Sequence, residues 1–388
     1  MDGTKTPAHV VLNALLLNLS ATYRSAGISQ YEQHVLEALG HIQANSPFRL
    51  TAITGEHQWH PPAGIRVYTP QWPVHHPLAR ILWEQGRLGR VLKRMNAQLY
   101  HGLAFVAPLH TPVPTVVTVH DLSFVHHADT FPAWKALYLK WFTRASIRRA
   151  RRVIAVSEST RQDVIQWLSL PPHRVVTVYN GVSSRFRPLP KPQVEAWRRE
   201  KGLPAQFILY LGTLQPRKNI ATLVRAYAQW RQAHPHASIP LILAGAKGWY
   251  YQDLFRLVET LGVREDVLFP GFVPSSELPY WYNAATLFAY PSLFEGFGLP
   301  VLEAMACGTP VIAANTTSLP ELVGSAGLLI PPTDTHQWQR ALERVLGDPS
   351  LRDHLVQQGL ERARAFTWER TARETLAVYH RVLEEHHA

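Results

Sequence analysis

The stretch PSLFEGFGLPVLEAMACGTPVI, residues 291–312, decides how the second half of this 388-residue chain folds. The apolar run ATLFAYPS leads into it, GFG supplies a turn, and LPVLEAMA has helical spacing. The pattern therefore predicts a strand, a turn and a helix in succession. Pro300 suits the first helical position, where the missing N–H of proline costs nothing.

The start of this helix predicts an anion site. Its first N–H groups have no partner within the helix and form the positive end of the helix dipole, so they favour a phosphate or diphosphate. Gly296 and Gly298 would let such a ligand approach the backbone closely. Glu295 and Glu303 flank the turn and would repel a phosphate, but ionised carboxylates accept hydrogen bonds from hydroxyl groups. A diphosphate with hydroxyls on both sides, as in a nucleotide sugar, satisfies both features.

A simpler interpretation of these two carboxylates stays open at this level. In it, Glu303 caps its own helix and interacts favourably with the helix dipole, while Glu295 is a solvated loop residue. Neither role needs a ligand.

Composition indicates a globular protein of two domains, because 388 residues exceed a typical single domain, and 46% hydrophobic with 17% charged residues exclude a disordered chain. Cys307 is the single cysteine, so no internal disulfide is possible, which fits a cytoplasmic location. Its setting in EAMACG favours packing over nucleophilic catalysis. The apolar run near the N-terminus reads as a buried strand rather than a signal peptide, since Asp2 and Lys5 give no positive front end. No run approaches the roughly 20 apolar residues of a membrane span, so we expect a soluble or peripheral protein.

The net charge of +11 is concentrated in the first half of the chain. Residues 1–190 contain 20 Lys and Arg against 9 Asp and Glu, whereas residues 191–388 contain 19 of each. Helical spacing over 78–95 predicts one helix with a basic side and an apolar side; the basic side is Arg80, Arg87, Arg90 and Arg94, and the apolar side is Leu78, Ile81, Leu88, Leu92 and Met95. A second basic stripe comprises Lys140, Arg144 and Arg148. Such stripes could bind the anionic inner face of the cell membrane or a phosphorylated acceptor. Most charged helix faces, however, are only solvated.

Short β-type runs alternate with helical patterns along the whole chain, which predicts an α/β protein with two Rossmann-like domains built on parallel sheets. The strand candidates of the first half are HVVLNALLL, GIRVY, TVVTV, RVIAV and RVVTVY; those of the second half are QFILYLG, PLILAG, DVLFPG, TLFAYPS, TPVIAA and GLLIPP. We predict domains at 1–185 and 206–366, a proline-rich linker at 186–205, and a C-terminal helix at 367–388.

Three further groups of residues stand at predicted strand ends, where ligands bind in such sheets. Gly212, Arg217 and Lys218 follow the first strand of the second domain, and the two cations would neutralise a diphosphate and a developing negative charge. Alternatively they are an exposed basic pair. His120 and Asp121 end a strand of the first domain; a lone histidine is more often structural, and Asp121 suits a turn cap. Gly27 precedes a helix and marks either another anion seat or an ordinary helix start.

Together these pieces resemble glycosyltransferase family 4, retaining enzymes of the GT-B fold. The resemblance is carried in chain order by AGISQY, WEQGRLGRVL, TVVTVHDLSF, VIAVSESTRQDV, VYNGV, LGTLQPRKN, residues 271–312 and FTWERTARETLAVYHRVL. Its most specific element is the eight-residue separation of Glu295 and Glu303. TVHDLSF with the upstream WEQ resembles the mannosyltransferase-like branch.

The resemblance implies two domains facing across a cleft, with a C-terminal helix from about Trp368 that crosses back to the first domain. It implies that the second domain binds a GDP- or UDP-linked hexose, such as mannose or glucose, for transfer to a glycan, lipid-linked or small-molecule acceptor. Neither a metal nor a cofactor is implied, and the leaving phosphate itself is thought to act as the base.

The resemblance also implies roles for particular residues. Glu295 would contact hydroxyls of the donor sugar, and Glu303 would bind the ribose. The backbone around Gly296, Phe297, Gly298 and Leu299 would hold the sugar and the diphosphate. The donor-binding set is completed by Gly212, by Arg217 and Lys218 on the diphosphate, and by Gly27 in the acceptor-side loop. The catalytic residues would be His120, which approaches the sugar from the first domain, with Glu295, Arg217 and Lys218. The sequence departs from the family at Ser29 and Gln30, where a second glycine and a basic residue are usual.

Three rival functions fit less well. A dinucleotide-dependent oxidoreductase would need a third glycine where Val301 stands and a suitably placed acidic residue. A GT-B nucleotide-sugar epimerase shares the architecture and is the nearer alternative. A nonenzymatic nucleic-acid binder would use the basic first half, but no recognised module is present.

Overall fold

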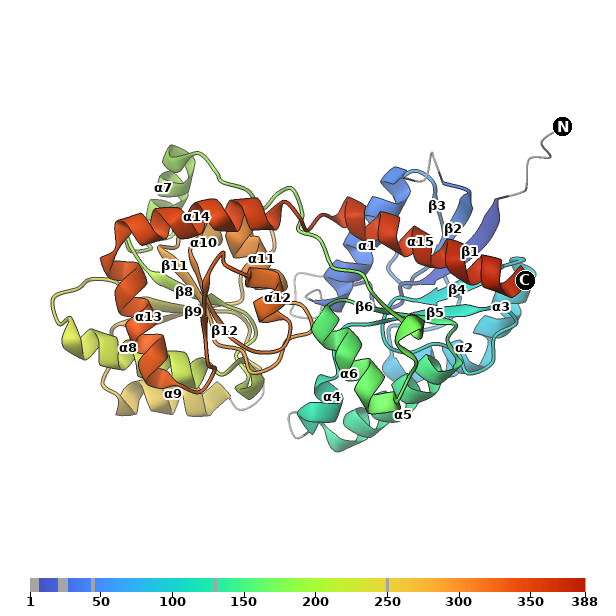
Figure 1. Ribbon diagram of the computed structural model, residues 1–388, viewed down its shortest axis with the longest axis horizontal. Helices are drawn as coiled ribbons and strands as arrows, with labels where there is room; N and C mark the ends of the chain where they lie inside the picture. Colours follow the sequence, from blue (N-terminus) through green and yellow to red (C-terminus); the bar gives the residue numbers. More distant parts are fainter. Residues whose placement is uncertain (1–6, 20–26, 43–45, 129–130, 249–250, 388) are drawn as a thin grey trace. The chain divides into compact units, whose positions relative to one another are not determined.

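The computed structural model describes residues 7–19, 27–42, 46–128, 131–248 and 251–387 of the chain. It divides into two compact units (Figure 1). The first unit comprises Met1–Gly181 with Thr367–Ala388, and the second comprises Val182–Phe366. Each unit is a parallel sheet flanked by helices, as the alternation of strand and helix patterns predicts.

The sheet of the first unit has seven strands in the order β3-β2-β1-β4-β5-β6-β7, all parallel. The strands are β1 (Ala8–Asn13), β2 (Phe48–Ile53), β3 (Ile65–Tyr68), β4 (Leu99–Gly102), β5 (Thr115–Val119), β6 (Arg152–Ala155) and β7 (Val175–Thr177). The sequence pattern missed β2 and β4. Polar residues interrupt both strands, FRLTAI and LYHG, so neither has the continuous apolar run that marks a buried strand.

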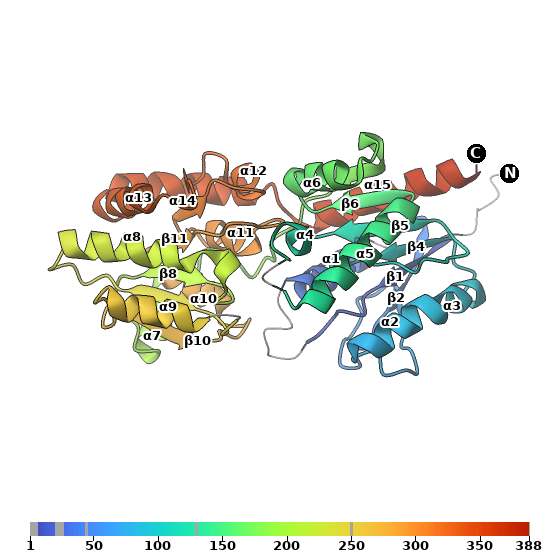
Figure 2. The same cartoon turned by 90° about the horizontal axis from the view of Figure 1, so that it is seen from below.

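Seven helices cover the described part of this sheet. They are α1 (Ile28–Ile42), α2 (Pro77–Gly86), α3 (Leu88–Arg94), α4 (Ser123–His126), α5 (Ala133–Arg149), α6 (Glu158–Leu168) and α15 (Trp368–His387). Figures 1 and 2 place α1 and α15 on one face and α2, α3 and α5 on the other. The strand order explains this split, because right-handed crossovers that reverse direction at β1 must change face.

The C-terminal helix is fixed to the first unit by a buried polar chain. The His101 ring lies 2.6 Å from the Tyr379 hydroxyl through Nδ1 and 2.8 Å from the Thr118 hydroxyl through Nε2. Gly181 passes so close to Trp368 that a Cβ at position 181 would lie 2.1 Å from the Trp368 backbone nitrogen. Only glycine fits there.

The second unit contains a six-stranded parallel sheet in the order β10-β9-β8-β11-β12-β13. Its strands are β8 (Ile208–Leu211), β9 (Leu241–Ala244), β10 (Val267–Gly271), β11 (Leu287–Tyr290), β12 (Val311–Ala314) and β13 (Leu328–Ile330). Its helices are α7 (Lys191–Glu200), α8 (Ile220–Ala233), α9 (Tyr251–Thr260), α10 (Leu278–Ala284), α11 (Leu299–Ala306), α12 (Leu319–Val323), α13 (Thr335–Gly347) and α14 (Pro349–Ala363). All six strands coincide with predicted runs.

Two predictions, one for the linker and one for a long helix, are wrong. The predicted linker 186–205 contains helix α7, which packs on α10 through the stacked rings of Trp197 and Tyr280, 5.4 Å apart. The predicted single helix over 78–95 is two helices that meet at Arg87. The break resets the helical phase, so Leu78 is 71% exposed although Leu88 and Leu92 are buried.

No helix in the described part of the chain combines the length and the apolar composition that a membrane span requires.

Candidate active site

The candidate site of the second unit lies at the carboxyl ends of β8 and β11. These strands are hydrogen-bonded neighbours, although one opens the unit and the other follows three strands later. Chain order reverses between them, and ligands of such sheets bind at this switch point. The turn after β8 and the turn after β11 are therefore brought together.

The turn after β8 packs closely against the residue that follows β9. Gly212 has φ +156°, and the backbone of Gly245 passes so near that a Cβ on Gly245 would lie 2.0 Å from the Gly212 carbonyl oxygen. A 3₁₀ turn over Pro216–Lys218 then leads into Asn219, which is the N-cap residue of α8 and has a left-handed φ of +54°. The Asn219 amide donates to the carbonyls of Pro291, at 3.1 Å, and Pro332, at 2.6 Å. This side chain joins the two turns.

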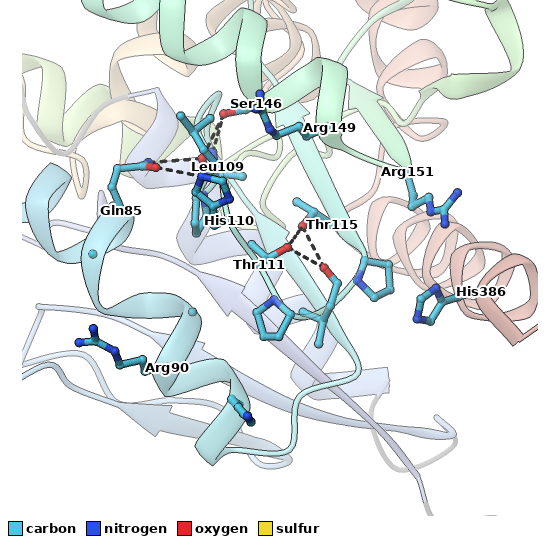
Figure 3. Close-up of a pocket in the computed structure, with 18 residues that line it drawn as sticks. Gln85, Arg90, Leu109, His110, Thr111, Thr115, Ser146, Arg149, Arg151 and His386 are labelled. Atoms are coloured by element: carbon cyan, nitrogen blue, oxygen red, sulfur yellow. Dashed lines mark hydrogen bonds between the residues drawn. The ribbon is translucent and has the colours of Figure 1, made fainter.

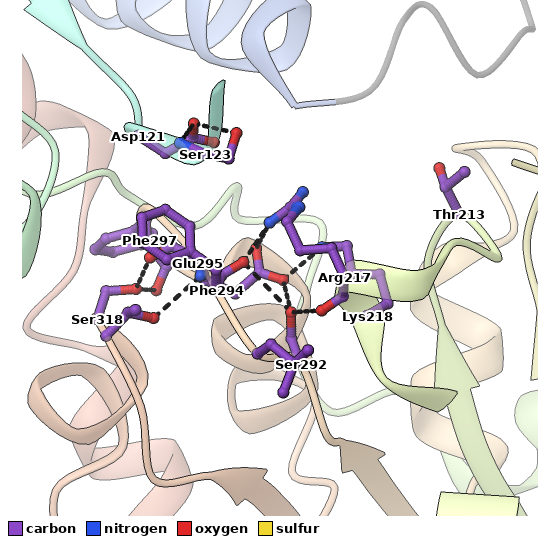
Figure 4. A network of polar contacts seen from close by, with 12 residues as sticks. Asp121, Ser123, Thr213, Arg217, Lys218, Ser292, Phe294, Glu295, Phe297 and Ser318 are labelled. Carbon is purple, nitrogen blue, oxygen red and sulfur yellow. Dashed lines mark hydrogen bonds and ion pairs between the residues drawn. The ribbon is translucent and has the colours of Figure 1, made fainter. Parts of the chain in front are cut away.

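Lys218 and Glu295 form a buried ion pair between the turns (Figure 4). The Lys218 ammonium donates to Glu295 Oε1 and, at 2.7 Å, to the Tyr290 hydroxyl. The Arg217 guanidinium donates to the Phe294 carbonyl and lies 3.9 Å from Glu295 Oε2. Both predicted cations thus face the predicted carboxylate.

The pKa of Glu295 lies below its ordinary value. Burial by itself would raise this pKa, but Lys218 and Arg217 together with hydrogen bonds from Lys218 and Ser292 more than offset it. The Ser292 hydroxyl donates to Oε1 at 2.6 Å. Glu295 is therefore an ionised acceptor at neutral pH.

Hydroxyl groups hold the turn that follows. The Thr317 hydroxyl accepts from the Glu295 backbone N–H at 3.0 Å. The Ser318 hydroxyl is within 3.1 Å of the Glu295 carbonyl and 2.9 Å of the Phe297 carbonyl. The backbone of the glycine turn is thereby fixed before any ligand binds, which lowers the entropy cost of binding.

Helix α11 begins at Leu299, one residue before Pro300, the first helical position that the sequence predicts. Gly298 caps it with φ +106°, and a Cβ there would lie 2.7 Å from a Leu319 methyl group. In the described chain, no acceptor pairs with the backbone N–H groups of Gly298 and Leu299. These two donors can bind an anion.

Glu303 lies on α11 and is 7% exposed. Its Oε2 accepts from the Tyr282 hydroxyl at 2.8 Å. Burial raises the pKa of Glu303 to about 7, and the opposing effects of Tyr282 and Arg185 are smaller. It does not cap α11, because it lies in the middle of the helix, so the simpler interpretation fails for this residue.

In the first unit, His120 follows the end of β5. Its Nε2 lies 2.8 Å from the Leu103 carbonyl, and the rings of Tyr31 and Phe105 meet it edge-on at 4.6 and 5.4 Å. Burial lowers the pKa of His120 to about 4, so the ring is neutral at pH 7. A carbonyl only accepts, so Nε2 carries the proton and Nδ1 is an acceptor.

The other predicted residues of the first unit have local roles. Asp121 accepts from the backbone N–H of Ser123 at 2.9 Å and from its hydroxyl at 2.6 Å, as a turn cap does. Gly27 has φ +65° and its carbonyl accepts from Tyr31 N–H at the start of α1. Ser29, at the family's usual second glycine, bonds both backbone groups of Asn18, at 2.9 and 3.0 Å. Residues 20–26 of this loop lie outside the described residues.

A cavity of about 790 Å³ in the first unit contains none of the predicted site residues (Figure 3). It lies by Thr115, the first residue of β5, and thus at the amino end of this strand, whereas His120 follows its carboxyl end. Basic and imidazole side chains line it: Arg90, Lys93, His110, Arg149, Arg151 and His386. All are exposed.

Sequence reasoning missed the contacts within the second-unit site. It assigned Glu295 to sugar and Lys218 to phosphate without placing them together, and it missed Ser292, Tyr290, Asn219 and Thr317. The signal was weak: Ser292 stands three residues before Glu295, and Asn219 follows Lys218 directly. Cys307 is buried and burial raises the pKa of its thiol, as expected of a packing residue.

Comparison with known proteins gives the class. A family model described as "Glycosyl transferases group 1" matches residues 193–362, and one described as "Glycosyltransferase Family 4" matches residues 31–186. The O-antigen chain mannosyltransferase B of Escherichia coli is 38% identical over 290 residues, which is 74% of this chain and 75% of that protein.

Solved structures agree in fold. A sucrose-phosphate synthase of Thermosynechococcus elongatus has a TM-score of 0.77 at 24% identity, over 97% of this chain and all of that one. Anabaena HepE, solved with UDP and glucose, has a TM-score of 0.72 at 20% identity, over 96% and 99% of the two chains.

The fold and these matches define a glycosyltransferase with two Rossmann-like units of the GT-B type. The chain belongs to glycosyltransferase family 4, and within it resembles mannosyltransferases, as the sequence motifs predict. It is an enzyme of hexose transfer, and the epimerase alternative is not favoured.

Proposed function

We propose that the enzyme transfers a hexose, with mannose the first candidate, from a nucleoside diphosphate donor that the second unit binds. The buried Lys218–Glu295 pair at the β8/β11 switch point carries this proposal, because it holds a cation against an ionised acceptor in the turn that leads to the two unpaired N–H groups at the start of α11. The 38% identical mannosyltransferase supports the sugar, and HepE with bound UDP supports a nucleotide donor. GDP and UDP both remain candidates.

Different residues bind the diphosphate, the sugar and the ribose of the donor. Arg217, Lys218 and the start of α11 face the diphosphate, where they stabilise negative charge on the leaving phosphate. Glu295 stays ionised because of Lys218 and accepts from hydroxyls of the sugar. Glu303 accepts from the ribose hydroxyls.

The reaction needs no protein nucleophile and no metal or other cofactor in this proposal. The bond from the anomeric carbon to the phosphate oxygen breaks, the acceptor oxygen bonds to that carbon with retention of configuration, and the acceptor proton passes to a leaving-phosphate oxygen. Neutral His120, with Nδ1 as an acceptor, orients a sugar hydroxyl. Gly27 allows the turn into α1 on the acceptor side.

The test combines GDP-mannose and UDP-glucose with a panel of acceptors and follows release of nucleoside diphosphate. We expect turnover with one donor, and a loss of roughly 100-fold or more in kcat/KM in Lys218→Ala and in Glu295→Ala. Lys201→Ala is the matched control, since it breaks an exposed Lys–Glu pair of 2.8 Å in the same unit. Transfer at the wild-type rate in both site variants, or an epimerised nucleotide sugar as the product, contradicts the proposal.

The enzyme is further proposed to work in the cytoplasm, which suits its single buried thiol, and at the inner face of the membrane. The basic excess of residues 1–190 supports a peripheral contact with anionic lipid through the first unit.

A further inference from the structure

Helix α5 exposes large apolar side chains to solvent. Trp134, Leu137 and Trp141 are 62%, 69% and 55% exposed. Their spacing of three and four residues places them on one side of the helix. The buried side chains of α5 are small or lie on its other side: Ala136, Thr143, Ser146 and Ile147.

Helix α2 adds to the same face of the unit. Leu78 and Leu82, one helical turn apart, are 71% and 67% exposed. These five side chains are the most exposed large apolar residues in the described chain, where the next is Phe272 at 41%. Figures 1 and 2 place α2, α3 and α5 on the same side of the seven-stranded sheet.

Unpaired cations flank the apolar side chains. Lys140, Arg144 and Arg148 repeat every four residues along α5 and are exposed. Within the described residues, none of the three forms an ion pair. Glu84 is the single carboxylate on α2, α3 and α5, and it is buried. The face therefore carries positive charge that no carboxylate on these helices offsets.

The combination of exposed apolar side chains and unpaired cations indicates which kind of partner this surface binds. A solvated helix would show the reverse distribution, with its apolar residues inward. A second copy of this chain in a two-fold dimer would set cations against cations, which is unfavourable. Tryptophan is enriched at the membrane–water interface, and Lys and Arg beside it attract anionic headgroups.

We propose that α5, together with the exposed side of α2, is a docking face for an anionic phospholipid bilayer. Trp134, Leu137 and Trp141 enter the interface, and Lys140, Arg144 and Arg148 meet the headgroups. The attachment is peripheral and weakens with salt, because exposed charges are screened. This inference rests on the proposed function, since it names the surface that brings the enzyme to an acceptor borne by a membrane.

The test is co-sedimentation of the full chain with vesicles of phosphatidylcholine alone and of phosphatidylcholine with phosphatidylglycerol. We expect binding to the anionic vesicles only, and release at high salt. Lys140→Gln/Arg144→Gln/Arg148→Gln should weaken binding on the order of 100-fold, from about fivefold for each cation. Trp134→Ser/Leu137→Ser/Trp141→Ser should weaken it more than about 10-fold.

Matched controls come from the second unit. Arg225→Gln/Arg264→Gln/Arg340→Gln removes the same charge from exposed sites, and Leu268→Ser/Phe272→Ser removes exposed apolar groups. Both should bind vesicles as the wild type does. Transfer to a water-soluble acceptor, assayed in parallel, should be unchanged in every variant, and its absence in the wild type would count against the proposed function but not against docking.

Equal binding of the wild type to both vesicle types overturns the proposal. So does unchanged binding in both α5 variants, or an equal loss in the controls. Sedimentation equilibrium that shows a dimer dissociated by the Trp134, Leu137 and Trp141 substitutions would assign the face to a second copy instead.

Discussion

Lys218 and Glu295 stand 77 positions apart in the chain and form a buried ion pair, 8% and 9% exposed, at the ends of two neighbouring strands. A charge buried to this degree is costly without its partner. The same two groups are the proposed contacts of the diphosphate and the sugar. The pair thus holds the site together before the donor arrives.

Removing one partner should destabilise the second unit more than removing both. Glu295→Leu leaves the Lys218 ammonium buried without a carboxylate, and we expect the free energy of unfolding to fall by about 3–5 kcal/mol. Lys218→Met/Glu295→Leu should lose less, because neither charge remains. Urea denaturation of the two single variants and the double variant measures this coupling.

The exposed pair of Lys201 and Glu277 gives the comparison for that cycle. Its side chains are 36% and 28% exposed, so its coupling should be about 1 kcal/mol or less. Equal, additive losses at Lys218 and Glu295 would mean that the ion pair is not coupled in solution.

Nucleotide affinity should rise with pH through neutrality. Burial raises the pKa of Glu303 to about 7 in the unliganded protein, and only the ionised carboxylate accepts from two ribose hydroxyls. Since the ionised fraction is about a tenth at pH 6 and about nine tenths at pH 8, we expect up to about a tenfold gain in affinity across that range. Calorimetric titration with GDP and UDP measures it.

Glu303→Gln is the control for this profile, because its amide has no charge to titrate and its affinity should be flat. Glu295 contributes no slope in this window, since its lowered pKa keeps it ionised. A wild-type affinity that does not change between pH 6 and pH 8 would remove Glu303 from ribose binding.

Gly298→Ala should damage both stability and donor binding. The left-handed φ of +106° and the 2.7 Å approach to Leu319 each oppose a Cβ, and the strain costs about 1–3 kcal/mol. A shifted Gly298 also misdirects the N–H groups that start α11. Thermal unfolding and nucleotide titration check both effects.

Gly308→Ala separates these two consequences. Its φ is +75°, but a Cβ there meets nothing closer than 3.6 Å, and it lies past the C-terminal end of α11. It should lower stability alone. Equal nucleotide affinity in Gly298→Ala and the wild type would show that the start of α11 does not contact the donor.

The sequence was most informative where a strand is an uninterrupted apolar run. All strands of the second unit are short apolar runs bounded by turn residues, such as LFAY before PSLFEGFG. β2 contains Arg49 and Thr51, and β4 contains Tyr100 and His101. Thr51, Tyr100 and His101 form hydrogen bonds with residues elsewhere in the unit. For example, buried His9 and Thr51 bond each other at 2.8 Å. Local pattern does not encode such pairings.

Arg217, Lys218 and Glu295 lie together because strand topology, which the alternating pattern predicts, fixes which strand ends are neighbours. The pairing of Lys218 with Glu295 depends on side-chain direction across β8 and β11, which spacing along one strand cannot supply. The sequence also failed to predict the break between α2 and α3, because local spacing alone does not mark it. Gly86 and Arg87 end one helix without a proline, and the apolar spacing of Leu88 and Leu92 is valid only within the second.

Two buried carboxylates of the first unit should make its stability fall as pH rises. Glu32 on α1 and Glu84 on α2 are 1% and 7% exposed, and burial raises the pKa of both; Glu84 adds to the effect on Glu32, while Arg80 opposes it. Glu84 accepts from the Asn13 amide at 2.8 Å, whereas Oε2 of Glu32 has no partner among the described residues. A folded pKa above the unfolded value means that the folded state retains protons which the unfolded state releases.

Their contribution to stability is therefore complete below the unfolded pKa and is lost as pH rises through the folded pKa. Glu32→Gln keeps the shape but cannot ionise, so it should be more stable than the wild type at pH 8 and about equal at pH 4. Glu37→Gln on the same helix is the control, because hydrogen bonds from His34 and Gln33 outweigh burial and lower the pKa of Glu37. That contribution is lost as pH falls, so Glu37→Gln should give no gain at pH 8. If the free energies of unfolding of Glu32→Gln and the wild type changed in parallel from pH 4 to pH 8, Glu32 would be ionised inside the folded protein, and its Oε2 would need a cationic partner.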